Sequence, residues 1–471
     1  MLLQPFKTKP ITYQGDTNKN SLPEGQGRGT YEDGSIYKGQ YLNGLPDGKG
    51  QAIYPNKETY KGDFKRGLMD GIGTYNYDNS VCYKGEFKNN HPNGIGQLFY
   101  LLNAAKKYEG EFKDGLRSGK GREKYADGSE YQGEFQSGVR QGSGLLKQLN
   151  GAFYQGSWFK NLKHGKGTET FEDKSVYSGD YESGAFHGYG KLIAANGTVY
   201  EGEWFQGQKN GQGKETINDG SFYEGDFIEG QKSGQGKFIW SNGAEYTGGF
   251  LKGKFSGQGK ICYPSGKQYS GEWRNGLKHG YGKFSWPDGS SYEGRYKKGK
   301  IHGHGERAYQ NGDIYKGEFK NGVPHGQGTL NFASGESYVG EFKHGKYTGY
   351  GIYTYRNGCS YTGNWSANMK HGYGKERYED GSEYHGNYEA ECRHGTGKFF
   401  YKDGTYYEGD YKFGRADGYG KRSFKGGQCY EGRWRNGVMH GEGKIVLSTG
   451  KIIKGVWENG SMVDTMQRPR F

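Results

Sequence analysis

The segment Tyr269–Ser291, YSGEWRNGLKHGYGKFSWPDGSS, decides the fold, because most of the chain repeats it. A tyrosine opens each copy, and sixteen of the steps between successive copies are 23 residues long while one is 25. The eighteen opening tyrosines stand at 37, 60, 83, 108, 131, 154, 177, 200, 223, 246, 269, 292, 315, 338, 361, 384, 407 and 430. A strict period of this length is the signature of a repeat architecture. The sequence therefore predicts one continuous array.

Positions within a copy are numbered here as offsets from the opening tyrosine, which is offset zero. Offsets zero, two and four hold tyrosine, glycine and a second aromatic residue, and this alternation of period two predicts a strand. A second alternating run contains Gly280, Gly282 and Trp286. The polar pair Asn275–Gly276 separates the two runs, and Asp288–Gly289 follows the second with a dipeptide that favours a type I′ hairpin turn. Each copy is predicted to be a β-hairpin, and 91 glycines argue against helices.

The glycines also suggest how such a chain buries apolar surface. On the tyrosine face a ring alternates with a position that has no side chain, so rings can lie in the gaps and one sheet can bury aromatic surface against itself. The predicted fold class is all-β: an elongated, rod-like, twisted single-layer antiparallel sheet of tandem hairpins. The predicted array spans residues 25–460, with full copies from Tyr37 through Tyr430 and partial copies at both ends. Residues 1–24 and 461–471 are predicted tails.

The pattern Y-x-G-x-[FWY]-x-x-G-x-x-H-G-x-G, at its 23-residue period, resembles the MORN repeat (membrane occupation and recognition nexus). Members of that family are elongated arrays of β-hairpins, and they act as scaffolds in junctional membrane proteins, cytoskeletal complexes and the radial spoke heads of cilia. The resemblance implies a non-catalytic scaffold or spacer that binds other proteins of a cytoskeletal assembly, with a ciliary axoneme and a radial-spoke-type complex as the leading setting. The alternative that it implies is a peripheral membrane adaptor.

Composition favours a folded cytoplasmic protein. An aromatic fraction of 16% argues against disorder despite a mean hydropathy of −1.06. The five cysteines are scattered and none forms a C-x-x-C pair, so neither a zinc site nor a disulfide framework is indicated. No apolar run suggests a signal peptide or approaches the ~20 residues of a membrane span.

The residue patterns give no sign of catalysis, a cofactor or a metal site. Eight histidines recur at offset ten, but successive copies would place them ~10 Å apart, whereas zinc ligands lie ~2 Å from the metal. The Gly-x-Gly pairs lack the following helix of a nucleotide-binding loop, and the carboxylates are as periodic as the rest of the copy. Nucleic acid is not an expected partner either, because the rings are needed to hold the sheet together.

Charge supports the membrane alternative. The net charge is +13, and lysines form a column at offset fourteen: Lys191, Lys214, Lys237, Lys260 and Lys283. Such a column could bind the headgroups of acidic phospholipids such as phosphoinositides. If the opening tyrosine pairs with offset seventeen, however, acids at offset three lie opposite most of these lysines, as in Asp180 with Lys191, and neutralise them, while Lys260 lies opposite Gly249 and stays unpaired. The sequence leaves both possibilities open.

Two further features suggest contacts with other chains. The single 25-residue step places Leu101 and Leu102 in an apolar run without a glycine turn, which predicts either an exposed contact or a longer strand. The two ends of an open sheet also leave strand edges unpaired, so the array could associate with a second copy through its ends.

Overall fold

The structure is a computed structural model that describes residues 6–77, 80–100 and 106–465. The described residues form forty β-strands and no helix. The chain divides into two units, Met1–Ser241 and Asn242–Phe471.

The first unit contains β1 (Thr12–Thr17), β2 (Pro23–Thr30), β3 (Ile36–Leu42), β4 (Leu45–Ile53), β5 (Thr59–Lys65), β6 (Leu68–Tyr77), β7 (Val81–Lys88), β8 (His91–Tyr100), β9 (Lys107–Lys113), β10 (Leu116–Lys124), β11 (Glu130–Gln136), β12 (Val139–Lys147), β13 (Phe153–Phe159), β14 (Leu162–Thr170), β15 (Val176–Glu182), β16 (Ala185–Ile193), β17 (Val199–Phe205), β18 (Gln208–Thr216), β19 (Phe222–Ile228) and β20 (Gln231–Ile239).

The second unit contains β21 (Glu245–Leu251), β22 (Lys254–Cys262), β23 (Gln268–Arg274), β24 (Leu277–Ser285), β25 (Ser291–Lys297), β26 (Lys300–Ala308), β27 (Ile314–Lys320), β28 (Val323–Asn331), β29 (Ser337–Lys343), β30 (Lys346–Thr354), β31 (Ser360–Ser366), β32 (Met369–Arg377), β33 (Glu383–Glu389), β34 (Cys392–Phe400), β35 (Tyr406–Lys412), β36 (Arg415–Ser423), β37 (Cys429–Arg435), β38 (Val438–Val446), β39 (Ile452–Glu458) and β40 (Ser461–Thr465).

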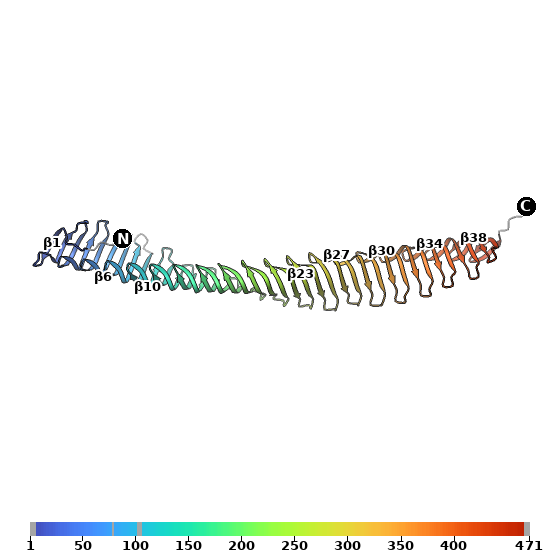
Figure 1. Cartoon of the computed structure of the whole chain (residues 1–471), viewed down its shortest axis with the longest axis horizontal. Coiled ribbons are helices and arrows are strands. Elements are labelled where there is room, and N and C mark those ends of the chain that lie inside the picture. The colour runs from blue at the N-terminus through green and yellow to red at the C-terminus, as the bar shows by residue number, and fades with distance from the viewer. Residues whose placement is uncertain (1–5, 78–79, 101–105, 466–471) are drawn as a thin grey trace. The chain divides into compact units, whose positions relative to one another are not determined.

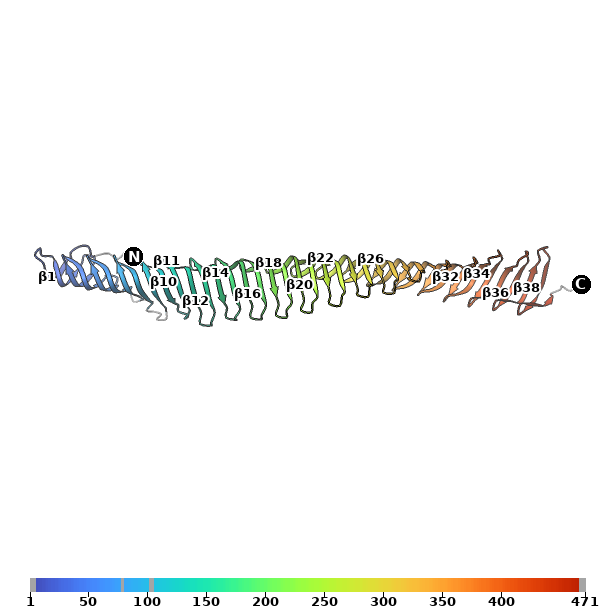
Figure 2. The same ribbon diagram turned by 90° about the horizontal axis from the view of Figure 1, so that it is seen from below.

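Within each unit, consecutive strands pair in antiparallel fashion, as β17 does with β18 and β18 with β19. Figures 1 and 2 show the strands of each unit in a single twisted row with no second layer over the described strands. This confirms the predicted all-β sheet of tandem hairpins. Strands also form outside the predicted array, because β1 pairs with β2 and β40 pairs with β39.

Each hairpin contains a β-bulge that the sequence analysis did not anticipate. In the copy that opens at Tyr269, Gly271 pairs with Gly282, but the next pair is Trp273 with Lys278. Residues 279–281 therefore lie opposite the single residue Glu272, which bends the hairpin. The bulge shifts the register, so Tyr269 pairs with Phe284 at offset fifteen and not with offset seventeen as predicted.

The predicted burial of aromatic rings in a single layer is confirmed. The Tyr269 ring lies over the glycine pair, and a Cβ atom added to Gly282 would lie 2.4 Å from the Tyr269 hydroxyl oxygen. That hydroxyl donates a hydrogen bond to the Glu272 carbonyl at 2.9 Å, and Tyr269 is fully buried. The ring also makes edge-on contacts with Trp273 and with Tyr296 of the next copy, at centroid distances of 5.2 and 5.1 Å. Aromatic pairs prefer this geometry.

The turn within each hairpin and the turn between successive hairpins differ in type, and the type I′ turn is not where the sequence predicted it. The type I′ turn lies at Asn275–Gly276, where φ is +52° and +79°. The prediction of a type I′ turn at Asp288–Gly289 was wrong, because Gly289 has a positive φ of +86° and Asp288 does not. Here the Gly289 N–H donates to the Trp286 carbonyl at 3.2 Å, and the Asp288 carboxylate accepts the Ser290 N–H at 2.9 Å. This longer loop needs only one left-handed residue.

Candidate interaction surfaces

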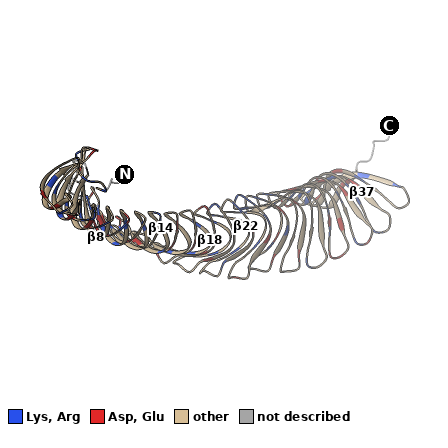
Figure 3. Ribbon diagram, turned by 60° about the vertical axis from the view of Figure 1, so that its left-hand side comes forward, with Lys and Arg blue, Asp and Glu red and all other residues tan. Residues whose placement is uncertain are grey.

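Side chains alternate between two faces of the sheet. We call the face that carries the opening tyrosines and the offset-four aromatics the inner face. The outer face carries offsets one, three, twelve and fourteen. Acidic and basic residues are interspersed along both units (Figure 3).

The lysine column lies on the outer face, but its partners are not the predicted ones. Because of the bulge, offset fourteen lies beside offset one of its own copy and of the next copy. Lys191 and Lys283 accordingly form ion pairs of 3.2 Å with Glu201 and Glu293. The predicted pairing of the lysines with offset three, such as Lys191 with Asp180, was therefore wrong.

Of the remaining lysines of the column, Lys214 and Lys237 also lie beside glutamates at offset one, whereas Lys260 does not. Lys214 lies between Glu201 and Glu224 in the register, and its Nζ is 4.4 Å from the centroid of the Phe222 ring. Lys237 also lies beside Glu224. The outer face from β16 to β20 thus alternates lysine with glutamate, which lowers its excess positive charge. Lys260 differs because both of its neighbours in the register, Thr247 and Ser270, are neutral. Leu101 and Leu102 lie outside the described residues.

The acids at offset three have a structural role instead. The Asp226 carboxylate accepts the Gln235 N–H at 2.9 Å, and the Glu272 carboxylate accepts the Tyr281 N–H at 2.8 Å. These N–H groups belong to the bulge, where the register shift interrupts the backbone ladder. The side chain therefore supplies a hydrogen-bond acceptor within the bulge, much as a cap does at a helix end.

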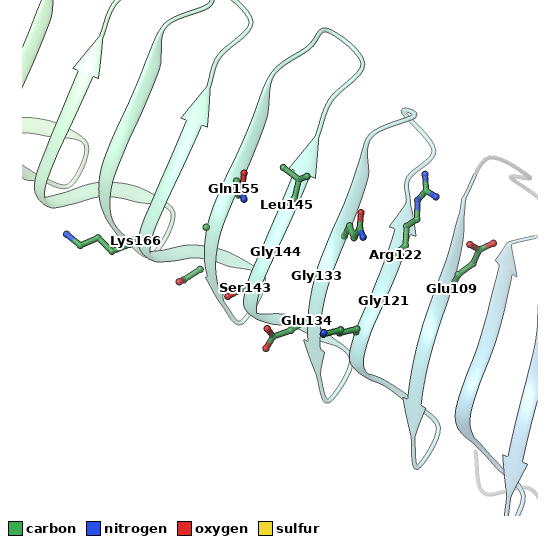
Figure 4. A pocket seen from close by; sticks show the side chains of 14 residues that line it. Glu109, Gly121, Arg122, Gly133, Glu134, Ser143, Gly144, Leu145, Gln155 and Lys166 are labelled. Atoms are coloured by element: carbon green, nitrogen blue, oxygen red, sulfur yellow. The ribbon is translucent and has the colours of Figure 1, made fainter.

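A shallow hollow of about 930 Å³ lies on the outer face across β9 to β14. Paired glycines such as Gly133 and Gly144 form part of its lining, and Glu109, Arg122 and Lys166 contribute charges of both signs (Figure 4). Arg122 already pairs with Glu130 at 2.7 Å, and Lys166 pairs with Asp180 at 2.8 Å. The hollow therefore has no strong preference for an anion or a cation.

Apolar side chains form a cluster on the outer face of the second unit. Val339 and Ile352 are directly opposite each other on β29 and β30, and they are 48% and 41% exposed. Tyr350 and Tyr373, on β30 and β32, are 58% and 60% exposed. Two strand spacings separate these tyrosines, which is ~10 Å. We call these four residues the outer apolar cluster; the lysine column is interrupted here.

The inner face carries a second feature that sequence reasoning missed. The residue at offset nine pairs with the offset-four aromatic and lies on the inner face, as Lys278 does opposite Trp273. In other copies it is Arg140, whose guanidinium lies 4.2 Å from the Trp158 ring centroid, or Phe186, whose ring stacks on Tyr177 at 3.7 Å. The period itself could have revealed this column, because offset nine holds a basic, aromatic or apolar residue in every copy and never an acidic one.

The surroundings of the Lys278 side chain on the inner face are largely apolar. Its ammonium group lies 4.1 Å from the centroid of the Phe284 ring and 4.9 Å from that of Tyr269. Burial disfavours the charged form and lowers the pKa of Lys278 to about 8.

The histidines and acids do not assemble into a metal site. Across residues 6–77, 80–100 and 106–465, no three His, Cys, Asp or Glu side chains are grouped closely enough to hold a metal ion. His187 instead pairs with Glu182 at 3.1 Å. No helix capable of crossing a membrane occurs in the described part of the chain.

Comparisons with solved structures give likenesses that are too weak to bear on function. The Drosophila melanogaster SAS-4 TCP domain, in complex with a proline-rich motif of Ana2, shares 14% identity at a TM-score of 0.22; the match covers 38% of this chain and 90% of that one. The Danio rerio CPAP TCP10 domain, in complex with a STIL peptide, shares 14% identity at a TM-score of 0.16, with 52% and 92% covered. Virginiamycin B lyase from Staphylococcus aureus shares 11% identity at a TM-score of 0.12, with 68% and 95% covered.

A comparison with curated proteins gives no match. The model of the MORN repeat, by contrast, matches tandem segments from 37–59 to 430–452, each opening at one of the periodic tyrosines. These segments account for most of the chain and coincide with the hairpins described above. The chain belongs to the MORN-repeat family.

Proposed function

We propose that this chain is a non-catalytic scaffold whose outer apolar cluster binds another protein. The observation that carries the proposal is the gathering of four exposed apolar side chains, Tyr350 and Tyr373 with Val339 and Ile352, on neighbouring strands of the outer face. Tyrosines supply large, stiff contact area and are enriched at protein interfaces. Exposed apolar groups that gather in one place, unlike scattered ones, indicate an interaction site.

The arrangement of charge favours a protein partner over a lipid surface. A polybasic site works through an excess of positive charge, worth ~1 kcal/mol per free cation at an anionic surface. On β16 to β20 the glutamates at offset one alternate with the lysines, and the ion pair between Lys191 and Glu201 is 3.2 Å long. The paired lysines therefore add little to lipid binding.

The binding proposal is tested by co-purification from cells that express the tagged full chain. The double variant Tyr350→Ser/Tyr373→Ser should lose proteins that co-purify with the wild type, while its circular dichroism stays unchanged. The double variant Lys191→Gln/Lys214→Gln serves as the control and should retain them. If the lysine variant loses partners while the tyrosine variant keeps them, or if the wild type floats with phosphoinositide vesicles and binds no protein, the proposal is wrong.

We also propose a cytoskeletal setting, with a radial-spoke-type complex of a ciliary axoneme as the specific assembly. This part rests on the family resemblance alone. Detergent extraction of ciliated cells tests it: the tagged chain should stay with the axoneme at moderate salt. Release with detergent would contradict the setting without affecting the binding proposal.

A further inference from the structure

Each hairpin has a slot on its inner face. We define the slot as the space above the opening tyrosine, bounded by the offset-four ring of the next copy. In three copies an aromatic ring at offset nine fills it by stacking on the opening tyrosine. The pairs are Phe186 on Tyr177 at 3.7 Å, Phe255 on Tyr246 at 3.8 Å and Tyr347 on Tyr338 at 3.8 Å.

The copy that opens at Tyr37 fills its slot in another way. Its offset-nine residue is Pro46, which cannot reach over the ring. Phe6, from the segment that precedes the first strand, enters the slot and becomes 95% buried, since its exposure is 5%. Its ring centroid lies 4.5 Å from that of Tyr31, 5.9 Å from Tyr37 and 6.1 Å from Phe64.

A backbone hydrogen bond completes this docking. The Phe6 N–H donates to the carbonyl of Gly67 at 3.1 Å, and the Gly67 N–H donates to the carbonyl of Pro46 at 2.7 Å. The slot thus accepts one aromatic side chain and the backbone N–H of the same residue. The chain itself shows which ligand this slot fits.

The copy that opens at Tyr315 repeats this slot without an occupant from the described residues. A hollow of about 410 Å³ lies over the opening tyrosine, within the range of small ligand sites. Its lining residues stand 278 positions after those of the first slot: Tyr309, Tyr315, Pro324, Phe342 and Gly345 correspond to Tyr31, Tyr37, Pro46, Phe64 and Gly67.

The backbone of the second slot is arranged in the same way. The Gly345 N–H donates to the carbonyl of Pro324 at 2.9 Å, as Gly67 does to Pro46. In the part of the chain that the structure describes, no backbone donor to the Gly345 carbonyl is found. The acceptor that Phe6 uses in the first slot is therefore available in the second.

Two differences define the ligand further. Leu330 stands where the first slot has Ala52, and the hollow persists with this larger side chain in place. Asp313 stands where the first slot has Ser35, which adds a carboxylate to the rim. A basic residue next to the aromatic one would complement this charge. The occupant of the first slot has that pattern, because Lys7 follows Phe6.

We propose that the Tyr315 slot binds an extended segment of a partner protein that presents a phenylalanine followed by a basic residue. The phenylalanine ring enters between Tyr315 and Phe342, its N–H donates to the Gly345 carbonyl, and the basic side chain pairs with Asp313. This inference deepens the scaffold function proposed above and rests on it, but it places a second contact on the opposite face of the sheet.

The test uses the full chain and a fluorescent peptide with the sequence of residues 3–12, LQPFKTKPIT, as the probe. Fluorescence anisotropy should show saturable binding, and a probe with the Phe6→Ala change should bind at least about tenfold more weakly, as expected for the loss of a buried ring. Pro324→Phe should fill the slot with a phenylalanine ring, as the phenylalanines at offset nine of other copies do. This variant should weaken probe binding by a similar factor. Asp313→Asn should weaken it less and remove part of its salt dependence.

The control variant is Ala416→Phe, which makes the same type of change at offset nine of another copy and should leave probe binding unchanged. Probe binding that is absent, or that Pro324→Phe leaves intact, would overturn the inference. Concentration-dependent dimers of the wild type that Pro324→Phe abolishes would assign the slot to a second copy and would also overturn it. The scaffold proposal fails separately, when no protein depends on Tyr350 and Tyr373.

Discussion

At the scale of single residues, the glycines fall into two classes with different costs of substitution. Gly282 lies under the Tyr269 ring, and an added Cβ atom would be 2.4 Å from the hydroxyl oxygen. Gly276 has open space around its Cβ position but a φ of +79°. The first glycine is needed for space and the second for conformation.

Gly282→Ala should therefore destabilise the chain by about 3 kcal/mol, because the buried ring has no room to move aside. Gly276→Asn should cost less than about 1 kcal/mol, because asparagine tolerates a left-handed backbone. Asn161 and Asn368 already occupy the corresponding turn position, with φ of +71° and +73°.

Urea unfolding gives the stability difference, and hydrogen exchange of the amides in β23 and β24 shows whether the loss is local. Equal costs for Gly282→Ala and Gly276→Asn would contradict the division into two classes.

At the scale of the hairpin, the bulge depends on the carboxylate at offset three. Asp226→Ala removes the acceptor of the Gln235 N–H and should destabilise the hairpin by about 1 kcal/mol, as the loss of a capping side chain does. Asp226→Asn keeps an acceptor oxygen and should cost less than half as much; asparagine stands at this offset as Asn364 and Asn387.

The matched control is Glu224→Ala on the same strand, at offset one, where the side chain makes no backbone contact of this kind. Thermal unfolding of the three variants compares them. A loss in Glu224→Ala as large as that in Asp226→Ala would mean that the acidic residues act through surface charge and not through the bulge.

The hairpin is also the scale at which sequence reasoning succeeded in part. The period, the strand alternation and the role of Gly282 followed from residue spacing, because close packing of rings on glycines is a local property. The register did not follow, because counting in steps of two through His279 and Gly280 assumes an uninterrupted ladder. The two extra residues of the bulge, 188–189 in this hairpin, moved Lys191 from Asp180 to Glu201. The signal available was the glycine at offset eleven, which has a positive φ at Gly280.

The inner-face slot could not be predicted from the sequence. Nothing in the periodic pattern predicts that Phe6, outside the array, packs on Tyr37, since a single aromatic residue in a tail carries no periodicity. Once that contact is known, the residue at offset nine becomes informative, and the hollow beside Pro324 identifies a second slot of the same kind.

At the scale of the whole chain, the buried tyrosines couple stability to alkaline pH. Burial raises the pKa of Tyr246, Tyr292 and Tyr430 to about 12, from an ordinary value near 10. Burial also raises the pKa of most other opening tyrosines, such as Tyr269. Below pH 10 these hydroxyls are protonated in both the folded and the unfolded chain, so their contribution to stability is complete. Above pH 10 the unfolded chain loses protons first, and stability falls.

The fall should be steep because the tyrosines act together. Each group with a raised pKa contributes a slope of about −1.4 kcal/mol per pH unit, and copies that contact their neighbours unfold cooperatively. Lys278 acts in the opposite direction, because burial lowers its pKa to about 8. Between about pH 8 and 10.5 the unfolded chain therefore holds more protons than the folded chain, and the contribution of Lys278 to stability rises with pH.

We therefore expect the circular dichroism of the sheet to be constant up to about pH 10 and to disappear within about one pH unit above it. The phenolate absorbance of the buried tyrosines should appear in the same step, because those hydroxyls ionise only on unfolding. Added salt screens the exposed lysine–glutamate pairs and should move the midpoint little. Phenolate absorbance that rises gradually while the sheet signal persists would show that the rings open copy by copy, and that each hairpin, not the array, is the cooperative unit.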